Sequence, residues 1–496
     1  MTFNKLSRKK TVKKLKNNSS LSNYIIFAII VLLSSYLIYT LVLTPVIGKA
    51  DNGDFGRMYN SLGIGPLGNS YDEIYTGYFQ QTWKISSPGF FIPWCNDWVF
   101  GCWLLKIPSL FALMFGVKYF DIRAVGIFYS LIFLLGVYLI LKYSKINSLG
   151  KLFGGIFILI FFTDSSYISY FNSFFGEATT ISFLFLFIGS ILNLIDKDNP
   201  KKLDLLFLFF ASFGFLTSKT QQLPLLIFMI LIYIALYKFY PTYRKLILSS
   251  SLIVITMCII TFFSIGTYTN RNNIYQAVFT GVLKGSETPK EDLIDLGLDP
   301  KFAPLANSGF YDKGLAFDPL GDEMMKDFYP NIGLSKILKF YAKHPNRAFE
   351  KFIASAENAY DFHKSSERDF NKGEYTTNKL INNFRVSLIN KYPGILRNFT
   401  VFFTFSLIYL LVLIYHFFKF KNREYKILTL TLLFLLAAGA SQLVLPVIGS
   451  GEADFGKHLF LINLAYDSLL CSCLIFLGVK AQNLFSKIYH NKKISN

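Results

Sequence analysis

The sequence contains little charge and little cysteine for its length. Only 16% of its 496 residues are Asp, Glu, Lys or Arg, and five are cysteines. A soluble protein of this size usually contains much more charge and divides into several domains. Cys258, Cys471 and Cys473 lie in apolar runs, where cysteine behaves as a small hydrophobic residue. Cys95 and Cys102 can pair or stay as thiols.

The sequence also lacks the local motifs of nucleotide and zinc chemistry. We find no P-loop, no dinucleotide-binding glycine fingerprint and no zinc-binding set of Cys and His. A soluble domain with interleaved basic and aromatic residues is missing too, so the net charge of +19 does not indicate nucleic-acid binding.

Apolar runs dominate the sequence, with 52% hydrophobic residues, 54 Phe and 30 Tyr, and a mean hydropathy of +0.40. A helix needs about 20 apolar residues to cross a bilayer, so the runs 150–163 and 203–217 are marginal and suit tilted or broken helices. We predict an all-α polytopic membrane protein of about ten transmembrane helices. The predicted spans are 24–44, 124–142, 150–163, 176–194, 203–217, 223–240, 246–266, 399–419, 427–446 and 459–480.

Lys and Arg residues gather in alternate connections between these runs, which is the positive-inside pattern. It predicts a multi-pass membrane protein with both termini in the cytoplasm. The first run is too long for a signal-peptide core and is read as an uncleaved span. The predicted parts are a basic N-terminus (1–23), a transmembrane module (24–266) with a first external loop (45–120), an extracytoplasmic helical insertion (267–398), a second transmembrane module (399–480) and a cytoplasmic tail (481–496).

Two external segments are long enough to carry function. The first loop ends in an amphipathic stretch, Trp98 to Val117, which suits the membrane interface. The insertion 267–398 is polar and is expected to be mostly helical, with Pro345 near the start of a second helix after 333–344. A segment of this length without spans usually forms a lid or a binding domain.

The first candidate site lies at 50–57, directly after the first span. Asp51 and Asp54 share one face if the chain becomes helical after Gly53. Sugar transfer from a lipid phosphate needs a base for the acceptor hydroxyl and a cation or metal for the departing phosphate. We predict that Asp51 or Asp54 is the catalytic base and that Arg57 holds phosphate. The same residues also suit an ordinary turn with an N-cap.

Two further candidates lie near the outer ends of spans. Glu177 begins an outside-to-inside span, where a carboxylate usually has a function or a partner, although the helix dipole also suits it. Lys219 lies between two spans and can bind phosphate or extend to the interface. We predict that Glu177, Lys219 and the nearby Asn172 contribute to substrate and phosphate binding.

The last external turn combines two carboxylates with a lysine and a histidine. Glu452 and Asp454, with His458, can bind a divalent cation, although one short stretch rarely supplies a whole metal site. Lys457 and His458 can instead bind phosphate. A divalent cation is therefore the one cofactor that we consider, and no cofactor is certain.

An internal echo links the first and last of these segments. Residues 45–48 (PVIG) lead to 54–57 (DFGR), and residues 446–449 (PVIG) lead to 454–457 (DFGK). The alternative explanation is that Gly, Pro and Asp end helices in many proteins. The functional interpretation requires the segments around positions 51, 177 and 454 to meet in one cavity at the outer leaflet.

These motifs resemble glycosyltransferase superfamily C (GT-C), integral membrane enzymes that use polyprenyl-phosphate sugars and carry an acidic motif directly after the first span. More narrowly, the chain is similar to the bacterial glycan-biosynthesis hexose transferase family linked to surface-layer glycans. The resemblance implies hexose transfer to an extracytoplasmic acceptor with inversion at the anomeric carbon. It rests on 50–55 (ADNGDF), 170–174 (YFNSF), 277–283 (AVFTGVL) and 453–458 (ADFGKH).

The sequence therefore predicts a membrane hexosyltransferase. Its expected partners are a polyprenyl-phosphate-sugar donor, a glycan or lipid-linked acceptor and membrane lipid, without nucleic acid. A transporter or flippase of lipid-linked glycans is the alternative, but it would need ionisable residues along a path through the bilayer. A third class is a non-enzymatic scaffold or receptor that uses 267–398 for recognition.

Overall fold

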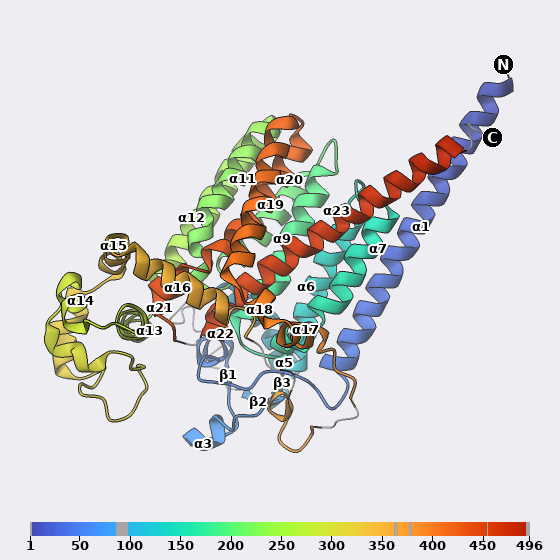
Figure 1. The fold of residues 1–496 in the computed structure, drawn as a ribbon. Helices are drawn as coiled ribbons and strands as arrows, with labels where there is room; N and C mark the ends of the chain where they lie inside the picture. The colour runs from blue at the N-terminus through green and yellow to red at the C-terminus, as the bar shows by residue number, and fades with distance from the viewer. Residues whose placement is uncertain are drawn as a thin grey trace.

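The computed structural model describes residues 2–85, 98–361, 364, 366–375, 379–453 and 455–492, and side chains between residues 20 and 488. Long apolar helices form a bundle whose two termini lie at the same end (Figure 1). Eight described helices are long and apolar enough to cross a membrane. They are carried by α1 (Thr2–Leu41), α6 (Arg123–Lys142), α9 (Gly176–Ile195), η5 (Thr220–Leu225) with α11 (Leu226–Phe239), α12 (Arg244–Phe263), α19 (Phe399–Lys419), α20 (Arg423–Ser441) and α23 (Phe460–Lys492).

The all-α polytopic membrane class is confirmed, and eight or nine candidate spans among the described residues stand beside the predicted count of about ten. The difference lies at the two runs that the sequence marks as marginal. The run 203–217 forms α10 (Lys202–Leu216), whose 15 residues extend over only about 22 Å. The run 150–163 belongs to a broken helix. There α7 (Ser148–Phe157) continues through a π-turn, η3 (Ile158–Phe162), and the chain then bends by 67° into α8 (Ser165–Ile168) and η4 (Ser169–Asn172). Counted as one span, this pair gives nine.

The broken helix determines where α9 begins. Asp164 sits in the bend and caps α8, because its side chain accepts a hydrogen bond from the Ser166 backbone at 3.0 Å. The chain then passes through η4 and enters α9 at Gly176, so Glu177 falls in the first turn of a fully packed helix. The bend thus places one candidate site residue at the end of the bundle opposite the termini.

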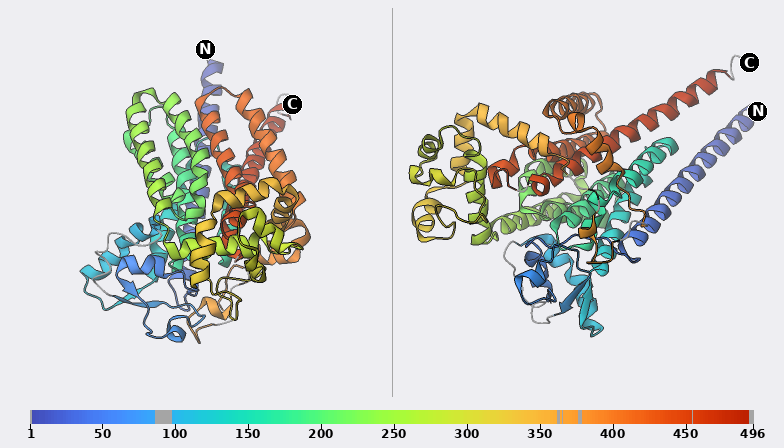
Figure 2. Two further views of the ribbon diagram at one scale, coloured as in Figure 1. Left: turned by 90° about the vertical axis from the view of Figure 1, so that its left-hand side faces the viewer. Right: turned by 60° about the horizontal axis from the view of Figure 1, so that its bottom comes forward.

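The loop 45–120, which the sequence predicts to be external, lies at that end (Figures 1 and 2). It contains a small antiparallel sheet that the sequence did not predict, because strands of two to four residues are too short to show alternation. Two helices form the predicted amphipathic stretch, and Phe115 beyond them is 80% exposed. The elements are α2 (Gly56–Tyr59), β1 (Ile64–Gly65), α3 (Tyr71–Ile74), β2 (Thr82–Ile85), α4 (Phe100–Leu104), α5 (Lys106–Met114) and β3 (Tyr119–Asp121).

The insertion packs at the same end, beside the first loop (Figure 2). Pro345 begins its second long helix, as predicted, and Ile337 and Phe340 on the preceding helix are buried. Phe349 on the second helix is half-exposed, and its ring packs against that of Phe399. The helices are α13 (Thr267–Gln276), α14 (Pro289–Leu296), α15 (Leu334–Lys343), α16 (Pro345–Asn358), α17 (Phe384–Lys391) and α18 (Pro393–Leu396), with π- and 3-10 turns between them.

Candidate functional site

The loop that carries Asp51 is shaped by a buried asparagine. Asn172 is fully buried, and its Nδ2 donates hydrogen bonds to the carbonyl oxygens of Leu41 at 3.0 Å and Ile47 at 2.8 Å. These bonds hold the end of α1 against η4 and turn the chain towards α9. Asn172 therefore builds the backbone of the site, and a substrate contact for it stays a prediction.

Asp51 has one carboxylate oxygen that is bonded and one that is not. Its Oδ1 accepts hydrogen bonds from the backbone N–H groups of Gly53 at 2.8 Å and Phe55 at 3.2 Å. Its Oδ2 is buried and has no hydrogen-bond partner among the described residues. Burial raises the pKa of Asp51 despite the two backbone bonds. Gly53 has φ +102°, so the tight turn requires glycine.

Asp54 is engaged by two cations. Arg57 on α2 lies 3.3 Å away, and Lys457 forms an ion pair with the other carboxylate oxygen. Lys457 comes from α22 (Phe455–His458), so the two segments of the sequence echo meet in space. The Lys457 ammonium also lies 5.2 Å from the centre of the Phe175 ring. Burial lowers the pKa of Lys457 to about 8, and Asp51 opposes this shift.

Glu177 and Lys219 form a second ion pair at 2.6 Å. The Glu177 side chain is 1% exposed, and that of Lys219 is 20% exposed. The carboxylate occupies the first turn of α9, where the helix dipole also stabilises it. The structure therefore joins two predicted site residues that lie on different helical connections.

His458 lies among three cations. Burial lowers its pKa to about 3, and the charges of Lys219, Lys457 and Arg57 lower it further in that order. The imidazole is therefore neutral near pH 7 and can bind phosphate as a hydrogen-bond donor rather than as a cation. The His458 carbonyl oxygen accepts a hydrogen bond from Nε2 of Gln221 at 2.6 Å. Gln221 is absent from the predicted set, although its polar position between two apolar spans was a usable signal.

The carboxylate of Glu452 is held by the insertion. Lys284 lies 2.8 Å and Lys351 2.7 Å from its two oxygens. Both oxygens of Glu452 therefore already have a cationic partner, and its role in binding a divalent cation stays a prediction. Asp454 lies outside the described residues. Within the part of the chain that the structure describes, no group of three or more His, Cys, Asp or Glu residues could hold a metal ion.

The insertion also contacts the first loop beside Asp51. The Lys49 ammonium lies 2.9 Å from Asp369, and the Gly48 backbone N–H donates to the Asp369 carbonyl at 2.9 Å. Further along the loop, Gln81 donates its backbone N–H to the side chain of Asn371 at 3.0 Å. The segment 366–371 thus fixes the loop from the insertion side.

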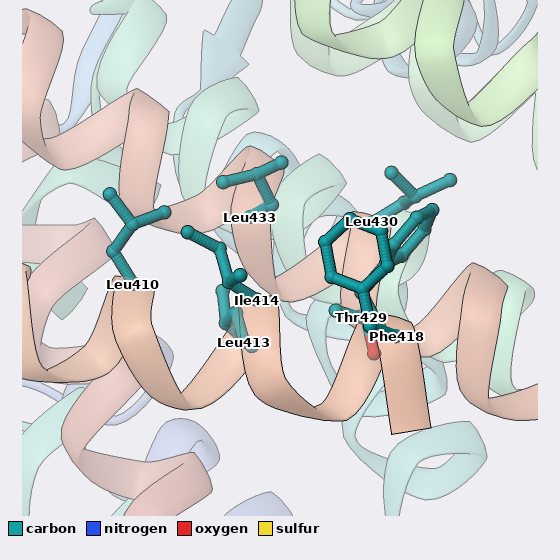
Figure 3. A pocket seen from close by; sticks show the side chains of 8 residues that line it. Leu410, Leu413, Ile414, Phe418, Thr429, Leu430 and Leu433 are labelled. Atoms are coloured by element: carbon teal, nitrogen blue, oxygen red, sulfur yellow. The ribbon is translucent and has the colours of Figure 1, made fainter. Parts of the chain in front are cut away.

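An apolar groove lies away from these charges, between α19 and α20 (Figure 3). Its volume is about 140 Å³, and no charged side chain lines it, so a sugar phosphate has no cationic partner there. The lining residues are Leu410, Leu413, Ile414, Phe417, Phe418, Thr429, Leu430 and Leu433.

The end of the bundle opposite the termini brings together the first loop, the α8–α9 connection, the Lys219 turn and α22. A sequence model of the family described as "YfdI N-terminal transmembrane domain" matches residues 8–495. The chain belongs to this family. Membership in the YfdI N-terminal transmembrane domain family agrees with the multi-pass membrane architecture. No curated protein and no solved structure matches the chain.

Proposed function

We propose that the protein transfers a hexose from a polyprenyl-phosphate-linked donor to an extracytoplasmic glycan or lipid-linked acceptor. The YfdI family is associated with GT-C-like glycosyltransferases, which favours a membrane protein that modifies its target with sugar. The observation that supports the proposal most strongly is a carboxylate with an unbonded oxygen, Asp51, beside a cluster of three cations. The carboxylate is suited to remove a proton from the acceptor hydroxyl, and the cations are suited to stabilise the departing phosphate.

Asp51 is the better candidate for the base. Asp54 is engaged by Arg57 and Lys457, so both of its oxygens already have cationic partners. Asp51 keeps Oδ2 without a partner, and its raised pKa makes it a stronger base than an ordinary aspartate. In the proposed reaction Asp51 takes the acceptor hydroxyl proton while the acceptor oxygen bonds to the anomeric carbon. The bond from that carbon to the phosphate oxygen breaks, and the polyprenyl phosphate leaves with the electron pair.

The cation cluster is suited to the leaving phosphate. Arg57, Lys219 and Lys457 come from three separate segments and all act on the same imidazole. Their own partners, Asp54 and Glu177, hold them in place before substrate arrives. Preorganised cations stabilise charge that develops on a departing phosphate without having to reorganise first. We further propose that a divalent cation can bind together with the donor phosphate. The three protein cations can stabilise the leaving phosphate without it.

The position at one end of the bundle suits a lipid-linked donor. The polyprenyl tail can remain among the spans while the phosphate and sugar reach the cluster from the interface. We place this end outside the cytoplasm of a bacterial plasma membrane, because the basic connections lie at the other end together with both termini. A flippase would need its charges distributed along a path through the bilayer, whereas the described site residues gather at one end.

The test compares surface glycans and lipid-linked intermediates by mass analysis in a strain that lacks the gene. Wild-type protein should restore one missing hexose, and Asp51→Asn should not. Asp72→Asn is the matched control, since Asp72 belongs to the same loop but is exposed on α3. Full restoration by Asp51→Asn would refute the assignment of the base. Translocation of a lipid-linked glycan in proteoliposomes without any new glycosidic product would instead support the flippase.

A further inference from the structure

A second buried cluster joins the insertion to the membrane helices. Arg385 on α17 and Asp467 on α23 form an ion pair at 2.6 Å, with side-chain exposures of 0% and 3%. Tyr167 on α8 donates its hydroxyl to Asp467 at 2.7 Å, and Tyr360 donates at 3.2 Å. The Arg385 guanidinium lies 4.4 Å from the centre of the Tyr167 ring and 5.0 Å from that of Tyr360. We call these four residues the Arg385 cluster.

The same part of the insertion completes the broken helix. Asp164 in the bend accepts hydrogen bonds from the backbone N–H groups of Arg385 at 2.8 Å and Val386 at 3.3 Å. Asn382 donates its amide to the Ile160 carbonyl at 2.7 Å, and Ser165 donates its backbone N–H to the Asn382 carbonyl at 2.8 Å. Irregular backbone at a break in a membrane helix is tolerated where protein groups satisfy it. Residues 382–386 provide those groups.

The Arg385 cluster is connected to two segments of the candidate site, the α8–α9 connection and α22. On one side Tyr167 precedes the η4 segment and the Glu177 end of α9, and its ring packs 5.7 Å from that of Phe460. On the other side Tyr360 donates its backbone N–H to the side-chain oxygen of Asn463 at 3.0 Å, in the first turn of α23, the helix that follows α22. The carbonyl of the next residue, Asp361, lies close enough to Gly456 that a Cβ there would be 3.4 Å from it. Tyr360 itself has φ +60°, so the chain is held in a conformation that tyrosine rarely adopts.

We propose that Arg385 is a positioning residue for sugar transfer, which holds α22 with Lys457 and His458 against the α8–α9 connection with Glu177. The inference rests on the proposed function. Arg385 does not touch the candidate site. It acts by binding Asp467 on the helix that follows α22 and Asp164 at the bend that precedes η4. Loss of Arg385 should therefore loosen the contacts that Lys457 makes with Asp54 and Phe175. Arg385 itself contacts none of these three residues.

The test measures the environment of Lys457 without any substrate. Membranes that contain the full chain are pulsed with acetic anhydride across neutral and alkaline pH, and acetylation of Lys457 is followed by mass spectrometry. The wild-type reactivity should have its midpoint near pH 8, because burial lowers the pKa of Lys457 to that value. Arg385→Gln should move the midpoint towards the ordinary value of 10.5, which lowers the reactive fraction at pH 8 by up to about 160-fold.

Two further variants make the result decisive. Asp467→Asn removes the other charge of the pair and should shift the midpoint in the same direction, so it decides the question if Arg385→Gln is not inserted correctly. Arg423→Gln is the matched control, because Arg423 binds the Lys197 carbonyl at 2.7 Å at the other end of the bundle. A midpoint that stays near 8 in a correctly inserted Arg385→Gln or Asp467→Asn protein would overturn the proposal. A shifted midpoint together with glycans that lack no hexose in the strain without the gene would leave Arg385 as a structural anchor and refute the proposed sugar transfer.

Discussion

Asp51 and Asp467 both have carboxylate oxygens shielded from solvent at the same end of the bundle, but the partners of these oxygens differ. Asp467 receives Arg385, Tyr167 and Tyr360, so both of its oxygens have partners. Asp51 has two backbone donors on one oxygen and none on the other among the described residues. A buried charge whose partners are complete supports structure, whereas one left incomplete costs stability and is characteristic of functional sites.

The comparison therefore assigns the two carboxylates to different tasks. Removing the charge of Asp467 breaks a network that joins α17, α23 and α8. Removing the charge of Asp51 takes away a group that the fold does not need in ionised form, because burial already disfavours that form. If the assignment is right, substitution of Asp51 causes the larger loss of activity, and substitution of Asp467 causes the larger loss of stability.

The largest effect is expected from Asp51→Asn. Loss of a general base reduces transfer by about 10²–10⁴-fold. Stability should not fall, because the raised pKa of Asp51 means that its ionisation weakens the fold as the pH rises above its unfolded value. Transfer to acceptor in isolated membranes and thermal unfolding in detergent measure both quantities. A variant that loses stability together with activity would show that Asp51 is structural.

Asp467→Asn should lose more stability than Asp51→Asn and less transfer activity. Breaking one side of a buried ion pair costs about 3 kcal/mol or more, because the partner charge is left without compensation. Thermal unfolding in detergent should therefore shift far more than in Asp51→Asn. The double variant Arg385→Met with Asp467→Leu is the control, since removal of both charges should restore much of the loss. Equal stability of Asp467→Asn and wild type would mean that the pair does not hold the insertion.

Much of the fold could be predicted from the sequence because spans and charged loops have strong local signals. The apolar runs and Pro345 gave helices where they were expected. In the sequence, the break between η3 and α8 was visible only as a marginal apolar run. The hydrogen bonds that satisfy its backbone and side-chain groups come from Asn382 and Arg385, which lie more than 200 positions away. Asp467 had a local signal as a carboxylate within a span. Arg385 had none, because it lies in a polar segment with many other basic residues.

The sequence echo shows the limit of local patterns at the site. Residues 45–48 form an irregular turn in which Thr44-Pro45 is cis, whereas residues 446–449 lie within the helix α21 (Leu445–Ser450). Identical residues thus have different local structures, and tertiary contacts decide between them. The ion pair of Asp54 with Lys457 links the two segments, but neither segment alone indicates it. The choice between Asp51 and Asp54 also required these partners to be known.

The pH profile of transfer sharpens the comparison on the side of Asp51. Activity should rise as the pH increases through the raised pKa of Asp51, because the base must be ionised. It should fall above about 8, where Lys457 loses its proton, by about tenfold for each further pH unit. In Lys457→Arg the cation persists, so the alkaline fall should move to higher pH while the acidic limb stays. An alkaline limb that is identical in both proteins would remove Lys457 from phosphate binding.

The smallest effect is expected from the two tyrosines on Asp467. Tyr360→Phe removes one hydroxyl donor at 3.2 Å and should cost about 1 kcal/mol, whereas Tyr167→Phe removes the shorter bond at 2.7 Å and should cost more. Thermal unfolding of the two variants in the same detergent tests the order. Neither should change transfer by more than a few-fold, because the Arg385 pair remains. If Tyr360→Phe abolished transfer without loss of stability, Asp467 and its partners would belong to the chemistry, and the division between the two carboxylates would fail.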